Sequence, residues 1–352
     1  MKGLSKGERT ALAGIAVATA AAAVAHYAGA GAVLAFVVAG VALAGQAWMV
    51  SFATEQVGER LGPSATGFMQ STLGNLPELF VVIFALQKGE VVVAQTSIIG
   101  SLLANALLVL GLVIVVGARR SDDSVMRFHK RLPNDTATLL LVTSFIIVIV
   151  AVALSSHDPA ARHVQGISTA AAIALLVVYG AWVIPYLRAG RSEGNAEHTP
   201  RVPVVVAGAL LAVAGVAAAL TSDWFVTALR PAIDELGISE AFAGLVIVAI
   251  AGNAVENAVG VVLARKGQSD LAVSVVKNSV AQIAAFLFPV LILVSLLFAT
   301  HLTFALAPVY VVALALSALL VWQVTGDGEA AAFEGWALIA VYVIIAVVAL
   351  YE

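Results

Sequence analysis

Long apolar runs, each about twenty residues in length, follow one another along most of the chain. A helix of this length spans the hydrocarbon core of a bilayer. The composition agrees, because 61% of the residues are hydrophobic and 11% are charged, whereas soluble domains carry about 25% charged residues. The runs are too long and too uniformly apolar for the strands of a membrane barrel. The sequence therefore predicts an all-α polytopic membrane protein.

Eleven transmembrane helices are expected. Their approximate ranges are 9–27, 31–57, 63–87, 90–117, 134–154, 164–188, 202–229, 239–265, 269–299, 303–323 and 332–351. The first segment, with its basic start, also fits a signal peptide, but the next apolar segment follows at once and favours a membrane helix. Two polar loops stand out, at 118–135 and 188–201.

Lysine and arginine are distributed unevenly between the two sides that eleven crossings create. The side of the N-terminus carries Lys2, Lys6, Arg9, Arg60, Arg119, Arg120, Arg127, Lys130, Arg131, Arg188, Arg191, Arg201, Arg265 and Lys266. The other side carries only Lys88, Arg162 and Arg230. Cytoplasmic loops are enriched in basic residues. We therefore expect an integral protein of the plasma or inner membrane, with a cytoplasmic N-terminus and an external C-terminus.

One short stretch occurs twice in the chain: GNLPE, which ends at Glu78, reappears as GNAVE, which ends at Glu256. Other residues separated by the same number of positions as Glu78 and Glu256 are also identical. These pairs are Ala65 and Ala243, Val81 and Val259, Lys88 and Lys266, Gly89 and Gly267, Ala94 and Ala272, and Ser101 and Ser279. Five helices would then repeat, and the odd number inverts the second copy in the membrane. We expect an N-terminal transmembrane helix (1–30), a first five-helix repeat (31–190), a cytoplasmic linker (191–201) and a second five-helix repeat (202–352).

Glu78 and Glu256 lie near the middle of apolar runs, at equivalent positions of the two copies. An ionised carboxylate is costly in hydrocarbon, so each should face a partner or a water-filled cavity. A protonated, hydrogen-bonded core glutamate is the alternative reading. Two glutamates that share a repeat position, each preceded by Gly-Asn, favour a functional pair.

The neighbours of the glutamates supply further oxygen ligands. Asn75 and Asn253 each lie three residues before a glutamate and share its helix face. Gly74 and Gly252 weaken the helix at the same place, and Pro77 frees a backbone carbonyl one turn earlier. Carboxylate, amide and carbonyl oxygens together suit a hard cation.

The following helices carry a second group of polar residues. They are Ser97, Ser101 and Asn105 in the first copy, and Lys277, Asn278, Ser279 and Gln282 in the second. Serine and asparagine also join membrane helices by hydrogen bonds, so a purely structural role stays open for each. Glu55 and Glu59 could line an ion entrance or form an ordinary solvated helix end.

The stretches GNLPELFVVIFALQKGEVVVAQTSIIGSLLANALLVLGL and GNAVENAVGVVLARKGQSDLAVSVVKNSVAQIAAFLFPVLIL resemble the two signature repeats of the calcium/proton antiporters. These belong to the calcium/cation antiporter superfamily, which includes the sodium/calcium exchangers. The resemblance covers the two quoted stretches and extends through the helix plan to the whole chain. It implies that the two glutamates bind cation and protons in turn, supported by Asn75, Asn253, Ser101, Ser279 and Gln282.

The chain departs from this family pattern at three positions. Asn278 replaces a usual glycine, Asn257 a frequent histidine, and Lys277 an apolar residue. If Lys277 faces the ion cavity, two glutamates and one lysine sum to −1, which suits a monovalent ion or a titrating lysine. If it snorkels to a surface, the site keeps −2 and suits a divalent ion.

The expected function is secondary active export of Ca²⁺ in exchange for H⁺, by alternating access at the two glutamates. A Na⁺/H⁺ or Na⁺/Ca²⁺ exchanger of the same superfamily is the alternative, and an intramembrane enzyme is a remote one. The six histidines lie near helix ends or in loops, and no nucleophile–base constellation is evident. No cofactor and no nucleic-acid partner are expected; the partners are membrane lipid, the transported cation and protons. A homo-oligomer is compatible with the sequence, and the lack of cysteine excludes disulfides.

Overall fold

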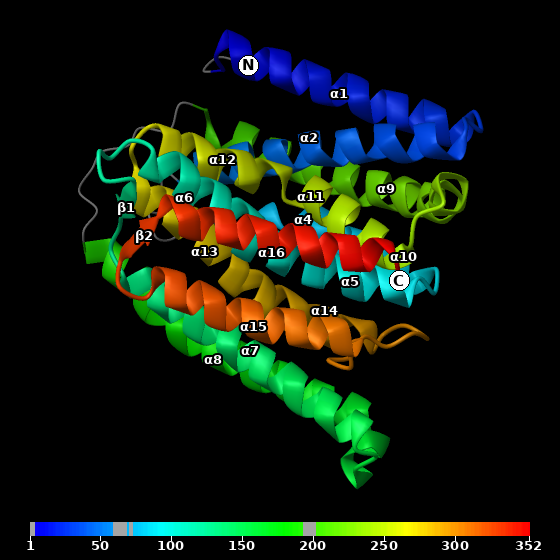
Figure 1. Cartoon of the computed structure of the whole chain (residues 1–352). Coiled ribbons are helices and arrows are strands. Elements are labelled where there is room, and N and C mark those ends of the chain that lie inside the picture. Colours follow the sequence, from blue (N-terminus) through cyan, green and yellow to red (C-terminus); the bar gives the residue numbers. More distant parts are fainter. Residues whose placement is uncertain (1–3, 59–68, 70–72, 193–201) are drawn as a thin grey trace. The chain divides into compact units, whose positions relative to one another are not determined.

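The protein is described by a computed structural model that covers residues 4–58, 69, 73–192 and 202–352 (Figure 1). The α-helices are α1 (Lys6–Tyr27), α2 (Ala32–Gly58), α4 (Leu76–Gln87), α5 (Val91–Leu103), α6 (Leu110–Ala118), α7 (Arg131–Ser155), α8 (Val164–Ser192), α9 (Val204–Leu236), α10 (Glu240–Phe242), α11 (Ala249–Gly252), α12 (Ala254–Arg265), α13 (Ser269–Gln282), α14 (Phe288–Ser295), α15 (Pro308–Thr325) and α16 (Ala332–Leu350). Three π-helical segments join some of them: η1 (Ala104–Val109), η3 (Ala243–Val248) and η4 (Ile283–Leu287). A short 3₁₀ helix, η2 (Pro159–His163), precedes α8.

Nine helices in the described part of the chain are long and apolar enough to cross a membrane. They are Lys6–Tyr27, Ala32–Val57, Val91–Ala118, Pro133–Ser155, Pro159–Pro185, Val204–Leu236, Ser269–Ser295, Pro308–Thr325 and Ala332–Leu350. The pair Glu240–Gly252 and Asn257–Arg265 would add one crossing, bent by 58°. α4 is a shorter apolar helix, and the segment expected over 63–87 lies partly outside the described residues. The chain is thus a mostly helical integral membrane protein.

Internal contacts divide the chain into two compact units. Unit 1 comprises Met1–Ala85, Gly180–Glu240 and Ala251–Val255, and unit 2 comprises Leu86–Tyr179, Ala241–Ile250 and Glu256–Glu352. Each unit therefore draws on both halves of the sequence.

In unit 1, α1, α2 and α9 pack together. The rings of Phe36 and Phe225 stack with centroids 4.5 Å apart, and Gly40 leaves room for the Phe225 ring, which a Cβ there would meet at 3.4 Å. Ile15 and Met49 belong to a second buried cluster that joins α1 to α2. The small and aromatic residues of α2 thus allow its close approach to both neighbours.

In unit 2, glycines bring helix backbones into direct contact. A Cβ on Gly100 of α5 would lie 2.2 Å from the carbonyl oxygen of Leu245 in η3. Similarly, a Cβ on Gly111 of α6 would lie 2.6 Å from the carbonyl oxygen of Gly335 in α16. Such contacts tolerate no side chain, which explains glycine in these otherwise bulky apolar runs.

A small sheet departs from the all-α expectation. The strands β1 (Val125–Arg127) and β2 (Glu329–Ala331) pair antiparallel, with Met126 opposite Ala330. β1 lies in the loop expected over 118–135. The strand is only three residues long, and its conformation depends on hydrogen bonds to a segment near the other end of the chain, so the local sequence did not predict it.

Several helix boundaries differ from those expected. α9 continues to Leu236 instead of ending near residue 229, and ends where Gly237 adopts a left-handed conformation with φ of +64°. Pro231 is accommodated inside this helix, as prolines often are in membrane helices. α15 begins at Pro308 rather than 303, which is the favoured first helical position for proline.

The local backbone repeats at the same offset as the sequence. α4 and α12 are both 12 residues long and begin directly after single turn residues, Asn75 and Asn253. Gly89 and Gly267 both have φ of +79° in the turn that follows. The π-helical segments η1 and η4 follow α5 and α13, and they end at equivalent positions, Val109 and Leu287. These matches in backbone conformation add to the identities in the sequence.

Candidate functional site

Glu78 lies in the first turn of α4, directly after the helix break at Asn75. Its side chain is 3% exposed. The backbone N–H groups at a helix start carry a partial positive charge, which favours a carboxylate there. The break therefore provides, inside an apolar segment, a position where a negative charge is less costly.

Residues from both sequence copies meet near Glu78 within unit 1. A Cβ placed on Gly252 would lie 3.8 Å from the Glu78 Cβ, an ordinary van der Waals distance, so the two segments lie side by side. Asn75 and Asn253 are 5% and 1% exposed, respectively. The Ser222 hydroxyl donates to the Pro77 carbonyl at 3.5 Å, the outer limit of a hydrogen bond. Oxygen atoms of several chemical kinds are thus concentrated around the start of α4.

The other acidic candidates are Glu256, Glu59 and Glu55. Glu256 lies in the first turn of α12, as Glu78 does in α4, but its side chain lies outside the described residues. Glu59 also lies outside them. Glu55 is exposed near the end of α2, which is compatible with either of its two expected roles. Gly74 precedes the break at Asn75.

The three polar residues of the first copy are all fully buried in unit 2. The Ser97 hydroxyl donates to the Ala94 carbonyl at 3.0 Å, and the Asn105 amide donates to the Ser101 carbonyl at 3.0 Å. Asn105 belongs to η1, and its amide therefore bonds the backbone next to the π-helical segment. π-Helical segments are frequent at functional sites, because they change which side chains share a helix face.

The second copy differs in carrying a buried cation. Lys277 of α13 is 1% exposed, and its ammonium nitrogen lies 3.3 Å from the Thr325 hydroxyl oxygen. That hydroxyl donates to the Val321 carbonyl at 2.7 Å, so it can accept from Lys277. The Lys277 ammonium group is therefore buried within unit 2. Its side chain points into the interior of unit 2, toward the last turn of α15, where partial negative charge favours a cation.

Lys277 does not share a helix face with Ser279 and Gln282, the buried candidate site residues of α13. Ser279 is two residues further on and points about 200° away around the helix. Ser279 and Gln282 are buried, with exposures of 1% and 3%, and Asn278 is half-buried. α13 therefore presents its ammonium group on one side and its serine on the other.

Two buried polar residues, Thr325 and Gln46, were not predicted from the sequence to make polar contacts. Thr325 lies at a helix end, and nothing in its neighbouring residues distinguishes it from other threonines. Gln46 lies within the apolar run ALAGQAWMV. Gln46 is fully buried in unit 1 and donates to Thr19 and Thr221. A lone glutamine in a membrane helix was the signal that could have identified it.

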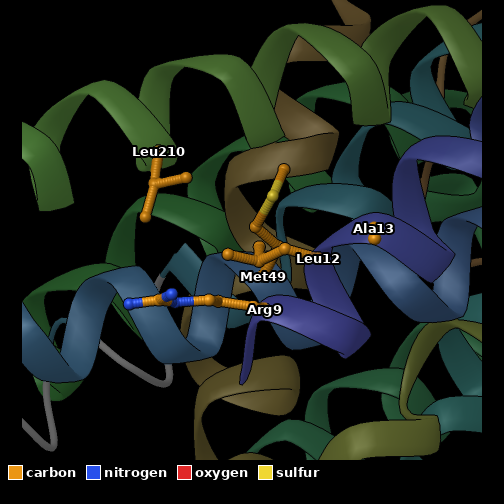
Figure 2. A pocket seen from close by; sticks show the side chains of 5 residues that line it. All are labelled: Arg9, Leu12, Ala13, Met49 and Leu210. Atoms are coloured by element: carbon orange, nitrogen blue, oxygen red, sulfur yellow. The ribbon is translucent and has the colours of Figure 1, made fainter. Parts of the chain in front are cut away.

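A separate cavity of about 580 Å³ opens among α1, α2 and α9 (Figure 2). Its lining residues are Arg9, Leu12, Ala13, Met49 and Leu210. The lining includes none of the candidate site residues and is apolar apart from Arg9. This cavity is therefore not the ion site.

Among the described residues, no three histidine, aspartate or glutamate side chains gather closely enough to hold a metal ion. A cation bound at Glu78 would accordingly need amide, hydroxyl and carbonyl oxygens as well as carboxylates. Hard cations accept all of these ligands.

Comparison with known proteins identifies the family of the chain. The profile of the family described as sodium/calcium exchanger protein matches residues 31–186 and 206–351. The chain is 31% identical over 326 residues to the vacuolar calcium ion transporter of Schizosaccharomyces pombe, covering 90% of this chain and 79% of that protein. It is 31% identical over 320 residues to the Ca²⁺/H⁺ antiporter ChaA of Bacillus subtilis, covering 89% and 90%.

Among solved structures, native YfkE superposes with a TM-score of 0.80 at 28% identity, covering 96% of this chain and 98% of that chain. The relatives are named as transporters and antiporters, not as enzymes. The chain belongs to the sodium/calcium exchanger protein family, whose members are secondary transporters.

Proposed function

We propose that the protein is a Ca²⁺/H⁺ antiporter that exports Ca²⁺ from the cytoplasm. The relatives named above as a calcium transporter and a Ca²⁺/H⁺ antiporter match this chain over about nine tenths of its length. The observation that carries the site is the buried carboxylate of Glu78 at the start of a broken helix, in a sequence motif that recurs at Glu256.

Glu78 and Glu256 are the alternating ligands of cation and protons in this proposal. When both are ionised, they bind Ca²⁺ together with Asn75, Asn253 and backbone oxygens. When both are protonated, they release it and the neutral site can return. An empty site with two negative charges is costly to move through the apolar barrier, and this cost couples the two fluxes. Ser97, Ser101, Asn105, Asn278, Ser279 and Gln282 support the site.

The proposed architecture is eleven helices, of which the first precedes two inverted five-helix repeats. The repeats are 31–190 and 202–352, joined by the linker 191–201. The equal lengths of α4 and α12 and the equal φ of Gly89 and Gly267 support a structural repeat. The basic-residue asymmetry supports a cytoplasmic N-terminus and an external C-terminus.

The buried Lys277 bears on which ion is carried. Its ammonium group contacts Thr325 and points away from Ser279, so we assign it outside the ion ligands. The site then keeps the two carboxylate charges, which suits a divalent cation. A Na⁺/H⁺ or Na⁺/Ca²⁺ exchanger is the second candidate, favoured by the same buried positive charge if it acts on the site.

Transport in proteoliposomes tests the proposal. A pH gradient is imposed, a dye reports internal pH, and Ca²⁺, Mn²⁺, Na⁺ or K⁺ is added in turn. Proton flux driven by Ca²⁺ in the absence of Na⁺ is expected. Flux driven only by Na⁺ would transfer the protein to the second candidate, and no ion-driven proton flux would overturn antiport altogether.

A further inference from the structure

A buried polar cluster joins three helices of unit 1. Gln46 lies near the middle of α2 and is 0% exposed. Its side-chain nitrogen donates to the Thr221 hydroxyl of α9 at 2.8 Å and to the Thr19 hydroxyl of α1 at 3.0 Å. Both donor hydrogens of the Gln46 amide are therefore used.

The oxygen atom of the Gln46 side-chain amide, in contrast, has no hydrogen-bond donor among the described residues. This oxygen, Oε1, is buried. A buried amide oxygen without a donor costs about 1–3 kcal/mol. In a site lined by hydroxyl groups, a water molecule is the donor that removes this cost. The Oε1 atom thus marks a position suited to an ordered water inside the membrane-spanning part of unit 1.

Thr221 of this cluster lies next to Ser222 in α9, so one helix carries both a hydroxyl of the cluster and a hydroxyl that contacts the candidate site. Thr221 and Ser222 are both fully buried, and the Ser222 hydroxyl contacts the carbonyl of Pro77, the residue before Glu78. The contact of 3.5 Å is loose enough to exchange with a water-mediated one. Hydroxyl groups and water can each accept one proton while donating another, whereas the apolar surroundings cannot.

We propose that Gln46, Thr221 and Ser222 form a hydrated proton relay to Glu78, separate from the ligands of the cation. A proton from bulk water passes through the water at Gln46 Oε1 and the two hydroxyl groups, and ends on the Glu78 carboxylate. Each relay group gives up one proton and takes up another from its neighbour, so one proton from bulk water reaches the carboxylate and no other reactant is consumed. Gln46 is a positioning residue, because it orders the water and does not itself change protonation.

This inference rests on the proposed Ca²⁺/H⁺ antiport and is tested with two fluxes in the same proteoliposomes. Ca²⁺/H⁺ exchange requires proton transfer, whereas exchange of radiolabelled Ca²⁺ for unlabelled Ca²⁺ at constant pH does not. Gln46→Leu and Thr221→Val should slow Ca²⁺/H⁺ exchange by about tenfold while changing Ca²⁺/Ca²⁺ exchange by less than about twofold. Thr19→Val is the matched control, because it removes the other acceptor of Gln46, which lies in α1 and is not part of the proposed relay, and should leave both fluxes near wild type.

Folding and steric effects are controlled separately. Gln46→Met keeps the length of the side chain without its polar atoms and should slow Ca²⁺/H⁺ exchange as Gln46→Leu does, which a purely steric role would not predict. If Gln46→Leu does not yield monodisperse protein, Thr221→Val alone carries the comparison of the two fluxes. Equal loss of both fluxes, or no loss of either, would overturn the relay. Failure of the wild-type protein to couple Ca²⁺ to protons would instead refute the proposed function.

Discussion

The two described stretches that follow the Gly-Asn-x-x-Glu motifs, 76–109 and 254–287, have similar local backbone but different buried chemistry. Ile99 of α5 and Lys277 of α13 occupy equivalent positions, and each is 1% exposed. Counted at the same spacing along the chain, Thr325, the partner of Lys277, corresponds to Ile147 of α7, which is also fully buried. The positions of the lysine and the threonine thus correspond to isoleucines in the first half of the chain. Both pairs of positions are buried, whereas their charge differs.

The glutamates are the strongest test of whether the copies remain functionally equivalent. Glu78→Gln and Glu256→Gln should each abolish Ca²⁺/H⁺ exchange, because each removes a charge that binds the cation and a group that carries a proton. Proton flux in proteoliposomes measures this, with Glu90→Gln, in the turn before α5, as the control that retains transport. Activity in both variants would exclude the glutamates as the shared site.

Moving the charge to the other copy should unfold the protein. Ile99→Lys would bury an ammonium group opposite a region where the equivalent of Thr325 is an isoleucine, and such an unpaired buried charge costs about 3–5 kcal/mol. We expect aggregated protein in size-exclusion chromatography after extraction in detergent. Ile99→Met, which keeps the volume without the charge, should remain monodisperse. A folded Ile99→Lys variant would mean that this copy also offers a partner for a cation.

Gly100 tests a close backbone contact at a position where the second stretch carries Asn278. Gly100→Ala would place a Cβ 2.2 Å from the Leu245 carbonyl oxygen, and separating the two segments should cost at least about 1–3 kcal/mol. Thermal unfolding in detergent measures the loss. Gly208→Ala in α9, where a Cβ has nothing within 4 Å, is the matched control. Equal melting temperatures of the two variants would contradict the close α5–η3 contact.

Removal of the lysine should have a modest effect on transport. Lys277→Met eliminates a positive charge from α13, so the affinity for Ca²⁺ should rise about threefold through weakened long-range repulsion. The KM for Ca²⁺, compared with that of Lys277→Arg, measures this effect. A switch of ion selectivity, or complete loss of proton coupling, would instead place Lys277 in the ion site.

The smallest expected effect is on stability, and it comes from the loops that follow α6 and α14. The loop after α6 is charged and pairs β1 with β2, whereas the stretch 296–307 after α14 contains no acidic residue. The Arg127 guanidinium, 2.6 Å from Asp123, holds the pKa of that carboxyl below its usual range. The ionised Asp123 carboxyl therefore stabilises the folded protein at neutral pH, and this contribution is lost as the pH falls through the lowered pKa.

Asp123→Asn should consequently lower the melting temperature by at most about 2 °C at pH 7, since both side chains of the pair are exposed. The difference from wild type should disappear in strong acid. Asp122→Asn is the neighbouring control. A difference that grows on acidification would contradict the assigned direction.

The amino-acid sequence was sufficient to predict a helical membrane protein of the exchanger type with paired glutamate motifs. Hydropathy over about twenty residues reports burial in lipid directly, and the Gly-Asn-x-x-Glu spacing carries its chemistry within one helical turn. The positions of the breaks at Asn75 and Asn253 were also indicated locally, by glycine and proline.

Which polar groups meet, in contrast, depends on tertiary packing. The Lys277–Thr325 contact, the Gln46 cluster and the β1–β2 pair all join residues that are distant in the sequence. Local periodicity assigns a residue to a helix face, but the partner of that face depends on how the helices pack. In a chain where most helix faces are equally apolar, hydropathy does not distinguish the lipid-facing side of a helix from the protein-facing side. The partners of the buried lysine and the buried glutamine are therefore determined only by the packing of the helices.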